Sequence, residues 1–167
     1  ESVTTIEEGA FYGAYNIETF NGKFAADGGR ILVSNGTLIA FASNCGVIEY
    51  TIPEDITKIG KGAFYNSDRL VNVKIGDNVT TIGSCAFNDC SGLNDVTIPD
   101  NVTTLLYYAF GACNHLKSVT IGSGVKSIEY HAFMYCSELS RVYIKATTPP
   151  TAVTKYDSYV NDHVWYA

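Results

Sequence analysis

The sequence has little charge, a single Met, a single Trp and no long apolar run. Only 17% of its 167 residues are charged while 46% are hydrophobic, which is typical of a chain with a buried core and excludes an intrinsically disordered one. No apolar run approaches the roughly 20 residues that a membrane-spanning helix needs. The 11 Lys and Arg residues are scattered and the formal net charge is −6, which leaves no basic stripe for nucleic acid or anionic lipid. We expect no nucleic-acid partner and no membrane insertion in this segment.

Cysteine is present in an odd number. Five Cys residues leave at least one thiol unpaired within a monomer, and this number does not indicate a disulfide-stapled scaffold. Composition alone leaves the redox compartment of the protein open.

The sequence repeats itself every 23 residues. When the copies are aligned, each has an Ile or Val eight residues before a shared Phe and an Ile or Leu five residues before it. A Cys or Ser follows three residues after the Phe, and Leu, Val and Ile come after that. A fixed period of this length predicts a solenoid in which like side chains of successive coils stack inside. The shared dipeptides are Ala63-Phe64, Ala86-Phe87, Ala109-Phe110 and Ala132-Phe133.

Each repeat contains signals for two short extended pieces and a turn. Residues 95–98 alternate polar and β-branched side chains, which favours a strand with Val96 and Ile98 facing inward. A Pro or Gly follows and ends the strand, and Asp, Asn or Gly two residues later favours a tight turn. A second extended piece, such as residues 79–82, precedes the Ala-Phe pair, which we expect on a short helical or 3-10 turn.

The pattern breaks near the beginning of the sequence. Residues 1–14 contain a partial repeat, whose Ala-Phe pair lies 53 residues before the next aligned pair, the normal period plus an insertion of 30. The insertion, residues 15–44, has two apolar runs around Asn35-Gly36, which is a strong signal for a β-hairpin that projects from or extends the stack.

Repeats then fill residues 45–150, so that the solenoid spans residues 1–150. Pro149-Pro150 ends the last repeat where its turn is due, and no Ala-Phe pair follows. We interpret residues 151–167 as a C-terminal cap or a truncated cap.

The repeat L-x-x-V-x-I-P-x-x-V-T-x-I-x-x-x-A-F-x-x-C resembles the BspA-like (Treponema-type) leucine-rich repeat of bacterial surface and secreted proteins. The resemblance covers nearly all of residues 1–150, although Leu-Leu-Tyr-Tyr at residues 105–108 replaces the usual Ile-Gly and the family's cap cannot be carried over. It implies a secreted or surface-attached solenoid that binds host proteins, other cells or glycans and has no catalytic activity. In one repeat the match is carried by Leu93, Val96, Ile98, Pro99, Val102, Leu105, Ala109, Phe110 and Cys113.

The column of Cys90, Cys113 and Cys136 has several interpretations. Neighbouring coils lie about 4.8 Å apart, and this spacing is compatible with the Cα separation of about 4.4–6.8 Å in disulfides. Stacked side chains run parallel, however, whereas a disulfide needs converging Cβ atoms. Ser67 shares the column and fits a small buried residue. We therefore favour structural thiols over metal ligands or disulfides.

Two other columns could carry chemistry. Cys85 and His131 share a column but stand two coils apart, about 10 Å at strand spacing, which is too far for one zinc ion or a nucleophile with its base. The acidic column of Glu54, Asp77 and Asp100 could bind calcium, yet solvation of turns is the plainer interpretation. We expect no metal and no cofactor.

The remaining candidates are the side chains on the outer face of the strands, because solenoids commonly bind along their sheet. Arg and Tyr are also frequent anchors at interfaces. A second candidate surface is the opposite wall, where several Tyr residues gather. The predicted partner-binding residues are Asn72, Lys74, Asp95, Thr97, Ser118, Thr120, Arg141 and Tyr143.

Together these observations predict an α/β solenoid of leucine-rich repeat type. We expect a right-handed superhelix with one parallel sheet of short strands, a wall of short helical or 3-10 turns, and a β-hairpin insertion. The predicted function is a non-catalytic extracellular module, secreted or on the cell surface, that binds a protein or glycan ligand such as host extracellular matrix or another cell. The alternative is a structural spacer or stalk that presents another domain, and an enzyme is the third class.

Overall fold

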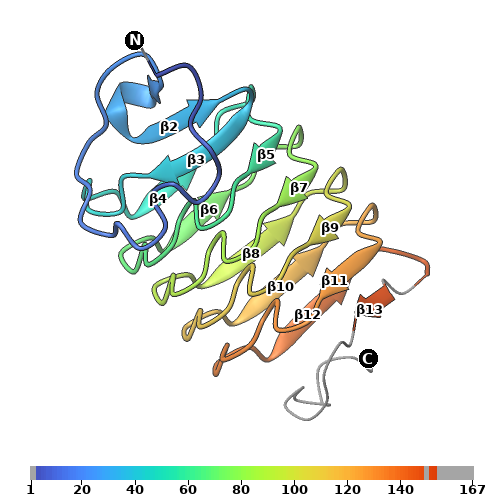
Figure 1. The fold of residues 1–167 in the computed structure, drawn as a ribbon. Helices are drawn as coiled ribbons and strands as arrows, with labels where there is room; N and C mark the ends of the chain where they lie inside the picture. Colours follow the sequence, from blue (N-terminus) through green and yellow to red (C-terminus); the bar gives the residue numbers. More distant parts are fainter. Residues whose placement is uncertain (1–2, 149–150, 154–167) are drawn as a thin grey trace.

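The structure, a computed structural model, describes residues 3–148 and 151–153. The chain winds into a β-solenoid of about five coils, and the strands of successive coils form two parallel sheets on different sides of the stack (Figure 1). No helix in the described part of the chain has the length and apolar character needed to cross a bilayer.

The first sheet is the one that the sequence predicts. Its strands pair in parallel and in register, so that Val96 lies beside Val119, and Val119 lies beside Val142. Inward Val and Ile side chains alternate with outward polar ones along β8 and β10, as the two-residue period of a strand requires. The five strands, in spatial order, are β12 (Arg141–Ile144), β10 (Ser118–Ile121), β8 (Asp95–Ile98), β6 (Asn72–Lys74) and β4 (Glu49–Thr51).

The second sheet corrects the prediction of a single sheet. The short extended pieces before each Ala-Phe pair form parallel strands, in which Ile59, Ile82 and Leu105 pair directly. The eight strands in spatial order are β1 (Ala25–Ala26), β2 (Ile31–Ser34), β3 (Thr37–Phe41), β5 (Lys58–Ile59), β7 (Thr81–Ile82), β9 (Thr104–Leu105), β11 (Ser127–Glu129) and β13 (Thr151–Val153).

The predicted wall of helical turns is wrong. Among the described residues the only helix is a 3-10 helix at Asp27–Gly29, outside the Ala-Phe segments. Each Ala-Phe segment instead contains two residues with a left-handed φ between 54° and 63°, one two positions before the Phe and one two positions after it. A left-handed residue interrupts a right-handed helix. These residues are Gly62, Asn66, Cys85, Asp89, Tyr108, Ala112, His131 and Tyr135.

This backbone shape turns amide groups toward the next coil. The Phe87 N–H donates to the Ala109 carbonyl at 2.8 Å, and the Asp89 N–H donates to the Gly111 carbonyl at 2.9 Å. The same bonds join Phe64 to Ala86 at 2.7 Å and Phe110 to Ala132 at 2.8 Å. We call this side of the stack the turn wall. Its coils are therefore joined by a third ladder of backbone hydrogen bonds, which satisfies amides that would otherwise be buried without partners.

The phenylalanines form one interior column, as predicted. The ring centroids of Phe64 and Phe87 are 4.7 Å apart, those of Phe87 and Phe110 4.9 Å, and those of Phe110 and Phe133 5.5 Å. The interplanar angles of these pairs are 13°, 5° and 8°. Stacked rings of this kind add to the stabilisation that burial of their area provides.

The column continues into the N-terminal part of the chain through Phe41. Its ring stacks on Phe64 at 4.8 Å, and its N–H donates to the Ala63 carbonyl at 2.7 Å. Strands β2 and β3 pair antiparallel around Asn35-Gly36, where the sequence predicts a hairpin, and β3 then pairs in parallel with β5. The hairpin is thus part of the stack. Its Ala40-Phe41 pair occupies the position that the Ala-Phe pair of a preceding coil would have.

Phe11 does not join this column. It packs edge-on against Phe20 at 5.8 Å, beside a second, smaller cluster of buried residues formed by Phe20, Leu32, Ile39 and neighbouring alanines. The expected partial repeat at the start of the chain therefore does not supply the next ring of the stack.

The cysteine column consists of thiols that donate hydrogen bonds. Each sulfur lies near the carbonyl oxygen of the Phe in the preceding coil, Cys90 at 3.0 Å from Phe64, Cys113 at 3.2 Å from Phe87 and Cys136 at 3.1 Å from Phe110. All five cysteines are free. Burial raises the pKa of the Cys90 thiol, which keeps the S–H donor in place. A thiol suits this column because it is a small apolar group with a weak donor.

Ser67 occupies the same column but its hydroxyl is buried without a hydrogen-bond partner. A buried hydroxyl without a partner costs about 1–3 kcal/mol. Replacing Ser67 with alanine is therefore expected to leave the free energy of unfolding unchanged or to raise it by about 1 kcal/mol. Urea unfolding followed by circular dichroism measures this, with Cys113→Ala as the matched variant that loses a hydrogen bond and is expected to destabilise. A clear loss of stability in Ser67→Ala would contradict this interpretation.

The proposed division of the chain into a partial repeat, insertion, repeats and cap stays a prediction. Strand β13 pairs in parallel with β11, so the chain enters a further coil after residue 150. The rest of the expected cap, residues 154–167, lies outside the described residues.

Candidate binding surface

The outer face of the five-stranded sheet presents two rows of side chains, with one residue of each row on each of β6, β8, β10 and β12. The register aligns Asn72 with Asp95, Asp95 with Ser118, and Ser118 with Arg141. The second row follows two residues later in each strand and contains Lys74, Thr97, Thr120 and Tyr143. All eight predicted partner-binding residues therefore lie on one face. Arg141, Tyr143, Lys74, Asp95, Thr97 and Asn72 are exposed, while Ser118 and Thr120 are half-buried.

Hydrogen bonds along the first row connect neighbouring coils. The Asn72 amide donates to the Glu49 carboxylate at 2.8 Å, and the Ser118 hydroxyl donates to the Asp95 carboxylate. These bonds fix side chains that would otherwise move freely on an exposed sheet. The end of the face at β12 is different, because the Tyr143 side chain is 56% exposed and stands beside exposed Arg141.

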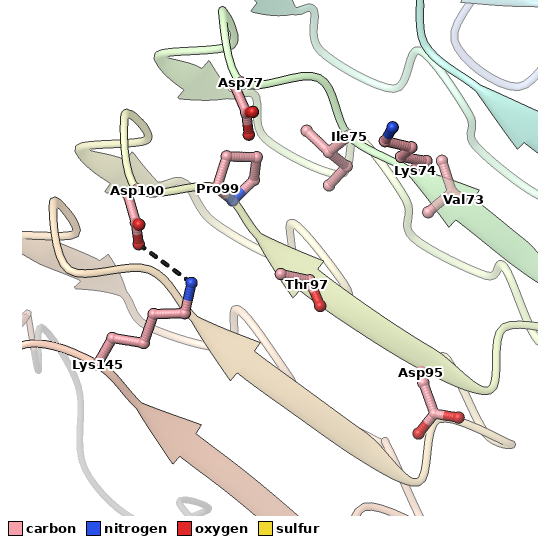
Figure 2. A pocket seen from close by; sticks show the side chains of 9 residues that line it. All are labelled: Val73, Lys74, Ile75, Asp77, Asp95, Thr97, Pro99, Asp100 and Lys145. Carbon is pink, nitrogen blue, oxygen red and sulfur yellow. Dashed lines mark hydrogen bonds and ion pairs between the residues drawn. The ribbon is translucent and has the colours of Figure 1, made fainter.

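The face is hollowed between β6 and β8 (Figure 2). The register between these strands contains a single residue pair, Asn72 with Asp95, whereas β8 and β10 pair through four. The hollow has a volume of about 350 Å³. It is lined by Val73, Lys74, Ile75, Asp77, Asp95, Thr97, Pro99, Asp100 and Lys145.

Charges of both signs surround the hollow. Lys145 follows β12 in sequence but reaches back across a coil, and its ammonium lies 3.5 Å from the Asp100 carboxylate (Figure 2). The Ser123 N–H donates to the same carboxylate at 2.8 Å. The Ser123 N–H and, to a smaller extent, the Lys145 ammonium hold the pKa of Asp100 below its usual value. Asp100 is therefore a carboxylate at neutral pH and offers acceptor oxygens at the rim.

The chemistry of the hollow suits recognition. Its floor contains Ile75 and Pro99, and its rim supplies ammonium, carboxylate and hydroxyl groups from Lys74, Asp77 and Thr97. It contains no His, Cys or Ser side chain that could act as a nucleophile or as its base. A mixed polar rim over a small apolar floor can hold a polar side chain or a sugar unit.

The structure brings three of the eight predicted residues, Lys74, Asp95 and Thr97, to the hollow. The other five lie on the same face outside its lining. Sequence reasoning missed Lys145, Pro99 and Asp77 as members of this site, although Asp77 stands in the acidic column. The position of Lys145 next to β12 gives no sequence signal that its side chain reaches Asp100, 45 residues earlier.

The other candidate columns form no shared site. Burial and the neighbouring Cys85 thiol raise the pKa of Tyr12, while the His131 ring packs against Tyr108 at 5.1 Å. In the acidic column, the Glu54 carboxylate accepts a bond from the Asn78 amide at 3.4 Å. Within the described part of the chain, no three or more His, Cys, Asp or Glu side chains gather closely enough to hold a metal ion.

Solved structures of bacterial leucine-rich repeat proteins are similar to this fold. A leucine-rich repeat protein from Bacteroides capillosus is 26% identical, with a TM-score of 0.64 over 74% of this chain and 99% of that one. A leucine-rich cell surface protein from Faecalibacterium prausnitzii is also 26% identical, with a TM-score of 0.55 over 74% of this chain. This chain spans 39% of the length of that protein.

The pneumococcal vaccine antigen PcpA shares the fold at 20% identity, with a TM-score of 0.61 over 88% of this chain and 42% of that one. No curated protein sequence matches the chain. The model of the BspA type leucine-rich repeat region matches residues 39–157 in six copies, which covers more than half of the chain and begins within β3. The stacked columns, the two parallel sheets and this match agree, and the chain belongs to the BspA-type leucine-rich repeat family.

Proposed function

We propose that the chain is a non-catalytic interaction module that binds a protein or glycan ligand through the outer face of its five-stranded sheet. The observation that supports this most is the in-register arrangement of exposed polar side chains, from Asn72 to Arg141, around a hollow with both charge signs. A fixed sheet presents such groups without ordering them on binding, and this lowers the entropic cost of association.

The place of action is the cell surface or the surrounding medium, with host extracellular matrix or another cell as the source of the ligand. The similarity to the cell surface protein of Faecalibacterium prausnitzii supports this location. The family and its fold are associated with repeat-based protein interaction rather than catalysis.

The strongest anchors of this face are Arg141 and Tyr143. Arg and Tyr are enriched among residues whose truncation costs most at interfaces, about 2 kcal/mol or more at a hot spot. We expect Arg141→Ala together with Tyr143→Ala to weaken ligand binding about tenfold or more. The measurement is a binding screen of the chain and the double variant against matrix proteins and a glycan array, followed by titration of each hit.

Lys126→Ala is the matched control, because Lys126 is an exposed cation next to β11 in the other sheet. It should bind as the unchanged chain does. A folded chain that binds nothing in these screens would favour the spacer function. A hit whose affinity is the same in the double variant would place binding elsewhere on the molecule.

A further inference from the structure

A group of aromatic side chains lies on the turn wall, on a different side of the coils from the hollow. Tyr107, Tyr108, Tyr130, His131 and Tyr135 form what we call the aromatic ridge. The ring of Tyr107 lies 4.4 Å from Tyr108 and 4.6 Å from Tyr130, and the His131 ring lies 4.9 Å from Tyr130. Four of these side chains are half-buried, and Tyr135 is 63% exposed.

The backbone under the ridge has the left-handed shape that the turn wall takes in every coil, but with aromatic residues where glycine would cost less. Tyr108 and His131 have φ angles of 54° and 63°, in the left-handed region that favours glycine. The equivalent residue of an earlier coil is Gly62. In addition, the buried Nδ1 atom of His131 has no hydrogen-bond partner. Strain that persists at aromatic residues is a reason to look for a function of their side chains.

The neighbouring residues make room for the rings and position them. A Cβ atom on Gly111 would lie 2.4 Å from Cδ1 of Tyr108, so only glycine leaves space for that ring. The Tyr108 hydroxyl contacts the Met134 sulfur at 2.9 Å. The Tyr107 N–H donates to the Glu129 carboxylate at 2.9 Å. The ridge is therefore a shaped surface with a carboxylate at its edge.

The charges around the ridge select a cation. The three segments that form this part of the wall, residues 83–89, 106–112 and 129–135, contain the acidic residues Asp89 and Glu129 and no Lys or Arg. The whole chain has a formal charge of −6. At the N-terminal end of the same wall, the Lys61 ammonium lies 5.7 Å from the centre of the Tyr12 ring, so a tyrosine of this wall already accepts a cation.

We propose that the aromatic ridge is a docking surface for a basic segment of a protein partner, with arginine side chains seated on the tyrosine rings and steered by Glu129. Guanidinium groups stack on aromatic faces and are less strongly hydrated than ammonium groups. Acidic groups at the rim raise the association rate of a cationic partner. A neutral glycan would gain hydrogen bonds from these carboxylates but no charge attraction. This surface is separate from the outer sheet face, and its partner need not be the same.

The test uses a synthetic peptide with arginines spaced by Gly and Ser, and the same peptide with each arginine replaced by citrulline. Citrulline keeps the shape of the side chain and removes its charge. Titration calorimetry with the whole chain should give a measurable affinity for the arginine peptide and a loss of about tenfold or more for the citrulline peptide. Added salt should lower the affinity for the arginine peptide, because it screens the attraction between the charges.

Variants locate the contact. Affinity for the arginine peptide should fall in the double variant Tyr130→Ala with Tyr135→Ala, and also in Glu129→Gln. It should stay unchanged in Arg141→Ala with Tyr143→Ala. Tyr108→Gly introduces glycine, the residue found at the equivalent position 62 of an earlier coil. This variant should keep the circular dichroism spectrum of the unchanged chain and bind the arginine peptide less tightly. If the ridge variants misfold, Glu129→Gln and the citrulline peptide still decide the question.

Three results would overturn the proposal. One is the absence of binding of the arginine peptide at millimolar concentration, and another is equal affinity for the arginine and citrulline peptides. The third is a glycan that binds the unchanged chain and loses affinity in the Tyr130 and Tyr135 double variant when the arginine peptide does not bind. The proposed binding by the outer sheet face is tested separately, by the effect of Arg141→Ala with Tyr143→Ala on its own ligand. Failure of one proposal can therefore be distinguished from failure of the other.

Discussion

Replacement of Phe87 by alanine is expected to lower the free energy of unfolding by about 3–5 kcal/mol. Phe87 is fully buried and stacks on a ring in the coil on each side, at 4.7 Å and 4.9 Å. Its removal leaves a cavity between two coils whose spacing is fixed by three ladders of hydrogen bonds, so the neighbouring rings have little freedom to close it. Urea unfolding followed by circular dichroism measures the loss.

Phe133→Ala is the matched control for this prediction. Phe133 ends the described column and is half-buried, with a ring neighbour, Phe110, at 5.5 Å. Phe133→Ala should lower the free energy of unfolding clearly less than Phe87→Ala does. Equal losses for the two variants would mean that the rings do not share a continuous interior column.

Replacement of Gly124 by alanine is expected to cost about 1–3 kcal/mol, although it adds only one methyl group. A Cβ atom at this position would lie 1.9 Å from the Asp100 carbonyl oxygen of the preceding coil, and a backbone atom cannot move aside as a flexible side chain can. The turn of one coil would have to shift relative to the other. Because Asp100 lines the hollow, the same variant should also weaken a ligand that binds there.

Ser123→Ala is the control for Gly124→Ala. Ser123 is the exposed neighbour of Gly124, and its contact with Asp100 is made by the backbone N–H, which alanine keeps. Its stability should stay within about 0.5 kcal/mol of the unchanged chain. A Gly124→Ala variant as stable as Ser123→Ala would show that the two turns are not in close contact.

The strands and the interior columns could be predicted because stacking makes the sequence self-consistent. Residues such as Val96 and Ile98 alternate with polar neighbours, and the 23-residue period repeats this pattern in every coil. Each column holds one kind of side chain because neighbouring coils place equivalent residues about 4.8 Å apart. The family resemblance rests on the same columns, and the match over residues 39–157 confirms it.

The turn wall could not be predicted from propensity. Ala, Phe, Tyr and Cys do not favour a left-handed backbone, yet Cys85, Tyr108 and Ala112 adopt one. The ladder between coils, with bonds such as Phe87 to Ala109 at 2.8 Å, offsets the local cost of these conformations. Gly62, Asn66, Asp89 and His131 are the sequence signals for them, because these residue types adopt positive φ more often than others.

The place of the hairpin in the stack could have been predicted from the sequence. Ala40-Phe41 stands 23 residues before Ala63-Phe64, so the regular period continues into the hairpin. Its role is hidden because the surrounding residues form antiparallel strands, which do not follow the rest of the repeat pattern. Ring stacking of Phe41 on Phe64 at 4.8 Å shows that one column can continue across a change of local structure.

The candidate surface was predicted in outline and not in detail. The alternation of strand residues identifies which side chains face outward, and Lys74, Asp95 and Thr97, which line the hollow, are among them. The hollow itself depends on the limited pairing between β6 and β8, and Lys145 reaches it from two coils away. Neither feature is encoded in the pattern of a single repeat.

Successive coils are held in register along the turn wall as firmly as along the sheets, through backbone hydrogen bonds between coils. Native-state hydrogen exchange of the Phe64, Phe87 and Phe110 amides tests it most directly, because each donates to the next coil at 2.7–2.8 Å. We predict that these amides exchange only through global unfolding, as slowly as the amide of Val119 in the middle of the five-stranded sheet. Exchange of the three amides at the rate of an exposed turn, while Val119 stays protected, would contradict the account.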